Sequence, residues 1–367
     1  MSGEPEPTAR ALRILLRGAP AWGGTVAVGA AGGWAFDLLH MPLAWMLGAI
    51  AATTAAALCR VPVRIPQRIA PVMFSVVGVL LGSTFPADIL SRAGRWSVSL
   101  AAMLPYVIVI TLAVAAYFRF VTRFNHPTRF FSACPGGLNE MMIMGGARGG
   151  DEAAIALIHG MRILTVVYVL PLSFQYFGGA DTAAARAAAR VTAIPDAAAW
   201  AIMAACAVAG AWGGIRLKLP AGVLVGPMIL SAAAHLAGWT DARPPDFLVH
   251  AAQVVIGCGI GCRFLGTAPA VFLRAVMVSL GSTFLMLGIG AAFAWALGPM
   301  AGASFAALIL AYSPGGITEM SLVAIALGID PLFVTTHHLG RIIMVLSATP
   351  VLFRLMRKSP APDAAAE

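Results

Sequence analysis

Apolar stretches of membrane-spanning length recur along almost the whole chain, from Trp22 to Phe353. A bilayer core of about 30 Å is crossed by roughly 20 apolar residues in a helix, whose backbone groups bond one another. Charged residues make up 11% of the 367 residues, against about 25% in an ordinary soluble domain. The sequence therefore predicts an all-α polytopic membrane protein with about 10–12 transmembrane segments.

The apolar pattern separates into two series of candidate segments, each with one segment broken by Pro-Gly-Gly. The first series is 20–38, 41–58, 68–85, 97–118, the broken segment 128–147, and 153–176. The second series is 195–215, 219–237, 247–264, 274–297, the broken segment 302–327, and 331–353. We predict a cytoplasmic basic N-terminus at 1–19, membrane repeats at 20–177 and 194–353, a linker at 178–193, and a basic, then disordered, tail at 354–367.

Two stretches of the chain, 134–171 and 313–350, match at one constant offset of 179 residues. Most of the shared residues are helix breakers or charges within apolar sequence, which packing alone does not require. The identical pairs are Pro135/Pro314, Gly136/Gly315, Gly137/Gly316, Glu140/Glu319, Met141/Met320, Gly149/Gly328, Asp151/Asp330, His159/His338, Arg162/Arg341 and Pro171/Pro350. Earlier matches at 178 or 179, such as Pro42/Pro220 and Gly78/Gly257, indicate that the whole half is duplicated.

The distribution of Lys and Arg favours halves of opposite orientation, because cytoplasmic loops carry an excess of these residues. If both broken segments turn back within the membrane, each half crosses five times. Of the 24 Lys and Arg residues, 17 then lie on the cytoplasmic side and five outside, which leaves Arg162 and Arg341 within helices. If both broken segments cross fully, the halves are parallel and the bias in the second half disappears. We therefore predict inverted repeats with a cytoplasmic N-terminus.

The duplicated Pro-Gly-Gly segments are candidates for a solute site near the membrane midplane. Pro135 cannot donate a backbone hydrogen bond, and Gly136 and Gly137 weaken a helix further, so the segment should break. Matched breaks in two halves of a membrane protein indicate a transporter site, where half-helix ends face the solute. A tight turn at the membrane surface is the alternative. We predict that the site comprises Pro135, Gly136, Gly137, Asn139, Glu140, His159, Arg162, Pro314, Gly315, Gly316, Thr318, Glu319, His338 and Arg341.

Each charged residue in this set has a structural alternative. Glu140 and Glu319 are either protonatable carboxylates of the site or helix N-terminal caps. Arg162 and Arg341 share a helix face with His159 and His338, and either bind an anion or pair with the glutamates. We interpret Asp151 and Asp330 as N-caps.

At PGGLNEM and SPGGITEM, each followed by its own HxxR helix, the chain resembles the bacterial AbrB-type membrane protein family. The resemblance covers essentially the whole chain and implies an internal duplication. Members of that family are often labelled ammonia monooxygenases or transcriptional regulators, and neither label follows from these residues. The broken, inverted halves also resemble, by architecture alone, the cation-proton antiporters and bile-acid symporters.

These features favour a secondary transporter or exporter of a small solute in the bacterial inner membrane, and arginine within the membrane favours an anionic or zwitterionic solute. A membrane regulator that affects gene expression indirectly is the alternative, because no soluble helix-turn-helix segment is present for direct nucleic-acid binding. A monooxygenase is disfavoured because the seven histidines are scattered. We expect no catalytic residues, metal or cofactor, and the bilayer and a small molecule or ion as partners. Assembly into a homo-oligomer stays open.

Overall fold

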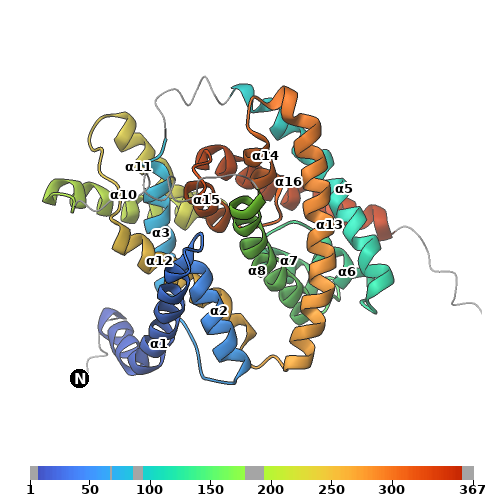
Figure 1. Ribbon diagram of the computed structural model, residues 1–367, viewed down its shortest axis with the longest axis horizontal. Coiled ribbons are helices and arrows are strands. Elements are labelled where there is room, and N and C mark those ends of the chain that lie inside the picture. The colour runs from blue at the N-terminus through green and yellow to red at the C-terminus, as the bar shows by residue number, and fades with distance from the viewer. Residues whose placement is uncertain (1–6, 67, 86–93, 178–193, 358–367) are drawn as a thin grey trace, which may run out of the picture. The chain divides into compact units, whose positions relative to one another are not determined.

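The computed structural model describes residues 7–66, 68–85, 94–177 and 194–357, and within these ranges every regular element is a helix (Figure 1). Among the described residues, six helical segments are long and apolar enough to cross a membrane. They are α5 (Ser97–Val121), α8 (Glu152–Phe177), α10 (Ala197–Arg216), α12 (Asp246–Gly261) together with the 3-10 turn that follows it to Phe264, α13 (Pro269–Ala301) and α16 (Pro331–Arg357). The shorter apolar helices are α2 (Ala44–Leu58), α3 (Ile69–Gly82), α11 (Gly222–Leu236) and α15 (Ile317–Ala326). The prediction of an all-α, multi-pass membrane protein is therefore confirmed.

The structure describes some of the predicted segments and leaves others outside its ranges. The first helix, α1, spans Pro7–Leu38 and so includes residues that the sequence assigned to the N-terminal segment before the first span. The predicted linker 178–193 and the tail from 358 onward lie outside the described residues.

The duplicated sequence is matched by duplicated backbone conformation. His40 and Lys218 have φ of 54° and 53°, and Leu43 and Ala221 have φ of 51° and 50°. Each pair is 178 residues apart, and a left-handed conformation costs a residue with a β-carbon roughly 1–2 kcal/mol. The same strained turn therefore precedes α2 and its counterpart α11.

The chain forms two compact units, and each takes elements from both halves of the sequence. The first unit contains α1, α2, α3, α10, α11 and α12, together with Ser321–Leu332. The second contains α5, the short helices α6 (His126–Ala133) and α7 (Leu138–Gly146), α14 (Phe305–Tyr312), and most of α13 and α16. It also contains α8 up to Val166 and the first residues of α15. The compact units therefore do not coincide with the repeats.

Close backbone contacts at glycine hold the first unit together. A β-carbon at Gly48 of α2 would collide with the backbone of Gly32 on α1, and one at Gly226 would collide with that of Gly210 on α10. These contacts are equivalent in the two halves, because Gly210 and Gly226 lie 178 residues after Gly32 and Gly48. Small residues allow membrane helices to approach closely enough for backbone contact.

The third helix of each half packs on the second helix of the other. The Ser75 hydroxyl of α3 donates to the Val223 carbonyl oxygen of α11 at 3.2 Å. The Ser231 hydroxyl of α11 donates to the Val79 carbonyl oxygen of α3 at 2.8 Å. Both residue numbers increase together, so α3 and α11 run in the same direction. Gly257 and Gly261 of α12 similarly lie against Met46 and Thr53 of α2, which makes α2 and α12 parallel.

We expect Gly210→Ala to destabilise the first unit, because the added methyl group would overlap the backbone at Pro227. Overpacking of this kind costs about 1–3 kcal/mol. Gly213 is on the same helix and has no neighbouring atom within 4 Å of an added β-carbon. Gly213→Ala should therefore be neutral or stabilising by up to about 1 kcal/mol. Thermal unfolding of both variants in detergent checks the difference, and equal midpoints would contradict the contact.

Candidate functional site

The first Pro-Gly-Gly segment separates two short helices, α6 and α7. Asn125 caps α6 by accepting a hydrogen bond of 3.0 Å from the Thr128 N–H, and the helix ends at Ala133. Cys134 and Gly137 are extended, with ψ of 132° and 145°, and α7 begins at Leu138. The chain therefore presents the carbonyl end of α6 and the N–H end of α7 on either side of Pro135.

The second segment repeats this geometry. Ser304 caps α14 through the Ala307 N–H at 3.2 Å, and the helix ends at Tyr312. Ser313 is extended with ψ of 146°, and α15 begins at Ile317. Both ends of the break fall 179 residues after those of the first.

A buried arginine and histidine on α8 satisfy the carbonyl end of the first break. The Arg162 guanidinium donates to the carbonyl oxygens of Cys134 at 2.9 Å and Gly136 at 3.1 Å. It also lies 3.0 Å from His159 Nδ1, while His159 Nε2 lies 2.9 Å from the Phe131 carbonyl oxygen. Since arginine only donates, Nδ1 accepts and Nε2 carries the ring proton that bonds Phe131.

The second break has the same arrangement on α16. Arg341 donates to the carbonyl oxygens of Ser313 and Gly315, the latter at 2.5 Å, and lies 3.1 Å from His338 Nδ1. His338 Nε2 lies 2.9 Å from the Leu310 carbonyl oxygen. In both copies, a cation therefore occupies the negative end of a short helix, where it is electrostatically favoured.

The two guanidinium groups are buried without a carboxylate partner among the described residues. Arg162 and Arg341 are each 3% exposed, and their bonded partners are carbonyl oxygens and histidine nitrogens. In both, Nε is buried and has no hydrogen-bond partner. The alternative of an Arg–Glu pair is therefore not what the structure contains. Two positive charges lie in an apolar interior, where an unpaired charge costs several kcal/mol.

The glutamates lie at the other side of each break, in the first turn of the following helix. The carboxylate of Glu140 packs over the α-carbon of Gly137, and that of Glu319 over Gly316. A carboxylate at this position is stabilised by the helix N-terminus. α7 has no side-chain cap at Gly137, so Glu140 supplies the negative charge there.

Other repeated residues have structural roles. Asp151 accepts from the Ala154 N–H and Asp330 from the Leu332 N–H, each at 3.0 Å, which confirms both as N-caps. Gly149 and Gly328 have φ of 80° and 66°, a conformation that glycine adopts without steric cost.

The second unit contains both breaks. The first break lies against α16, the helix whose Arg341 donates to the carbonyl oxygens of the second break. A β-carbon at Gly136 would be 3.0 Å from Val345 Cγ1, one turn beyond Arg341 on α16. The Thr349 hydroxyl lies 4.0 Å from Cys134 Sγ. The two breaks differ in burial: Asn139 and Glu140 are exposed, whereas Thr318 is 6% exposed and Glu319 is half-buried.

Sequence reasoning missed a polar network beside the second break. Tyr106 of α5 donates to the Tyr312 carbonyl oxygen, and the Tyr312 hydroxyl donates to the Ser99 carbonyl oxygen at 2.5 Å. His337, which the repeat leaves without a counterpart, lies 2.9 Å from the Ser99 hydroxyl. The only available signal was the position of Tyr312 directly before SPGG. No group of three or more His, Cys, Asp or Glu side chains converges within the described ranges.

Comparison with known proteins gives one family and two relatives. The family described as "Transition state regulatory protein AbrB" matches residues 45–357. The chain is 25% identical over 356 residues to "Uncharacterized protein YhjN" of Bacillus subtilis (strain 168), covering 90% of this chain and 92% of the relative. It is 25% identical over 325 residues to "Putative regulator AbrB" of Escherichia coli (strain K12), covering 88% of this chain and 92% of that protein. No solved structure matches the chain.

Proposed function

This chain belongs to the AbrB family, and we propose that it is a secondary transporter or exporter of a small anionic solute in the bacterial inner membrane. The observation that carries the proposal is the pair of buried guanidinium groups without carboxylate partners, one at each helix break. An anion that approaches the breaks would compensate these charges and could accept from the N-terminal N–H groups of α7 and α15.

The glutamates provide a way to couple anion binding to protons. Glu140 and Glu319 occupy the helix N-termini that an anion would use. A carboxylate and an anion repel each other there, and protonation of the carboxylate removes the repulsion. We propose that each glutamate takes up a proton as the anion binds and releases it as the anion leaves.

Helix directions support inverted repeats. α2 and α3 follow one another with ten residues, 59–68, between them, which favours opposite directions across the membrane. Since α3 is parallel to α11, α2 then opposes its own counterpart α11. Halves of opposite orientation place equivalent breaks toward opposite sides of the membrane. The difference in burial between Asn139 and Thr318 fits a state in which one break is accessible and the other is closed.

The experiment is uptake into proteoliposomes, with phosphate, acetate, pyruvate, malonate and glutarate as labelled probes. We expect at least one anion to be taken up faster than in protein-free liposomes, with a rate that depends on an imposed pH gradient. If none of the anions is moved while matched organic cations are, the anion site is contradicted.

A regulatory role is the second candidate, because the Escherichia coli relative carries the word regulator in its name. The two functions are compatible if transport changes the level of a metabolite that other proteins sense. A transport-inactive Glu140→Gln/Glu319→Gln variant separates them: restored transcript levels in a deletion strain would favour regulation independent of transport.

A further inference from the structure

A group of four buried side-chain atoms in the second unit has no hydrogen-bond partner among the described residues. The atoms are Nε of Arg162, Nε of Arg341, Oγ of Ser132 and Oγ1 of Thr283, and each of these residues is at most 3% exposed. Buried polar atoms are rarely left unpaired, because the loss of hydration is costly. All four atoms can donate a hydrogen bond, so together they suit a ligand that offers acceptors.

The two guanidinium groups belong to different breaks but share one region of the second unit. They lie close enough for the charge of Arg341 to act on Arg162. Both charges also act on the hydroxyl of Tyr106, which donates to the Tyr312 carbonyl oxygen at the second break. One ligand between the breaks can therefore meet both positive charges.

Thr283 lies on a face of α13 that passes both breaks. Ser279, Thr283 and Gly290 are within about 40° of one another around the helix axis. The Ser279 hydroxyl donates to the Ile158 carbonyl oxygen of α8 at 3.5 Å. A β-carbon at Gly290 would lie 3.3 Å from the Tyr312 carbonyl oxygen. The unpaired hydroxyl of Thr283 is thus between a contact with the helix of the first break and a contact with the second break.

Ser132 adds a hydroxyl at the first break, in the last turn of α6. It follows Phe131, whose carbonyl oxygen lies 2.9 Å from His159 Nε2. The residues equivalent to Ser132 and Thr283 at an offset of 179 are Ala311 and Leu104. Each hydroxyl is therefore present in only one half, and the duplication does not account for either.

We propose that one small dicarboxylate binds between the two breaks, with one carboxylate at each guanidinium group. The inference rests on the proposed anion transport and specifies its class of solute. Each guanidinium is held at its own break by two carbonyl oxygens, which leaves its Nε–H as a donor. Two fixed positive charges are compensated by two negative charges, whereas a single carboxylate would leave one of them uncompensated. The hydroxyls of Ser132 and Thr283 supply donors to the remaining carboxylate oxygens.

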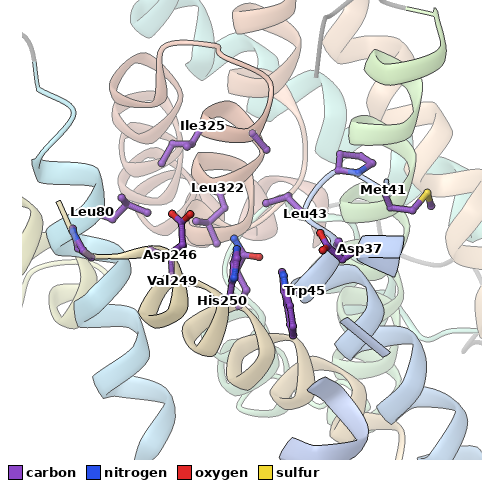
Figure 2. A pocket seen from close by; sticks show the side chains of 15 residues that line it. Asp37, Met41, Leu43, Trp45, Leu80, Asp246, Val249, His250, Leu322 and Ile325 are labelled. Atoms are coloured by element: carbon purple, nitrogen blue, oxygen red, sulfur yellow. The ribbon is translucent and has the colours of Figure 1, made fainter. Parts of the chain in front are cut away.

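The cavity at the end of α1 does not suit the same solute. It has a volume of about 200 Å³ and is lined by residues of the first unit. Figure 2 shows Asp37 and Asp246 on opposite sides of it, with His250 and Trp45 between them. Two carboxylates repel a dicarboxylate, so we assign the solute to the region between the breaks.

The test is calorimetric titration of the full chain in detergent. Malonate, succinate and glutarate are the probes, and their monomethyl esters are the matched monoanions. We expect at least one dicarboxylate to bind with one molecule per chain. Its monoester should have a Kd at least about tenfold higher, because it lacks one charge-assisted pair.

Thr283→Val and Ser132→Ala test the site without removing an arginine that the fold requires. Each variant removes an unpaired buried hydroxyl, so the unfolding temperature of the ligand-free protein should rise. The Kd for the dicarboxylate should also rise, by about tenfold, because a hydrogen bond to a charged group is lost. Ser282→Ala is the matched control, since this hydroxyl of α13 is also buried but donates to the Ser279 carbonyl oxygen at 2.9 Å. It should leave the Kd unchanged.

The results that would overturn the proposal differ from those that would overturn anion transport. Equal affinity for the monoester, two molecules bound per chain, or an unchanged Kd in both hydroxyl variants would each exclude a dicarboxylate shared by the breaks. Anion transport would still stand if proteoliposomes accumulated a monoanion. If no dicarboxylate binds and no anion is taken up, both proposals fail.

Discussion

Replacement of Arg162 or Arg341 by methionine is expected to prevent accumulation of the folded protein. Methionine is similar in length but cannot donate, so it leaves two buried carbonyl oxygens and one histidine nitrogen without partners in each case. Each such group costs about 1–3 kcal/mol, and ordinary protein stability is only about 5–15 kcal/mol. Size-exclusion profiles and unfolding temperatures in detergent measure the loss.

The arginine prediction has two controls. Arg354→Met changes an exposed arginine on α16, the helix that carries Arg341, and should leave the folded yield unchanged. Arg162→Lys keeps the charge but lacks the planar fork that reaches two carbonyl oxygens. It should therefore fall between wild type and Arg162→Met. A stable, monodisperse Arg162→Met protein would show that the break at Pro135 does not need this cap.

The Glu140→Gln/Glu319→Gln variant is expected to fold normally but to lose proton-coupled anion uptake. Glutamine keeps the size of the side chain at each helix N-terminus and removes the site of proton exchange. We expect pH-driven uptake of whichever probe the wild type accumulates to fall to the level of protein-free liposomes. Proteoliposome uptake under an imposed pH gradient measures this.

Glu152 provides the matched control for this variant. It is an exposed glutamate in the first turn of α8, and its carboxylate packs over Gly146 much as Glu140 packs over Gly137. Glu152→Gln should therefore transport at the wild-type rate. Full uptake by the double variant would exclude the proposed role of the carboxylates. It would not by itself contradict anion binding at the breaks.

The sequence predicts the helix breaks well, because proline and paired glycines have a strong local effect on the backbone. Pro135 and Pro314 end their helices, and Asp151 and Asp330 cap the next ones, as local chemistry requires. The partners of Arg162 were not predictable in this way. They are carbonyl oxygens 26 and 28 residues earlier in the chain. Every residue has a backbone carbonyl group, so residue types do not indicate which ones an arginine bonds.

The compact units and the cavity at the end of α1 were also not predictable from the sequence. The repeat indicates two halves, but α3 packs on α11 and α12 on α2, so each unit combines both halves. Pairing of this kind depends on where glycines such as Gly78 and Gly257 meet another backbone, which the sequence does not specify. Asp37, Gln253 and Leu322 are far apart in the chain, and nothing in their spacing indicates a common wall.

Side-specific labelling tests the central claim most directly, since it needs no knowledge of the solute. Asn139→Cys and Thr318→Cys are introduced separately into a variant without the five natural cysteines. A membrane-impermeant maleimide is then applied to right-side-out and to inside-out vesicles. The account predicts that the cysteine at 139 reacts from one side only and that the more buried one at 318 reacts, more slowly, from the opposite side only. Labelling of both positions from the same side would contradict inverted breaks that open alternately.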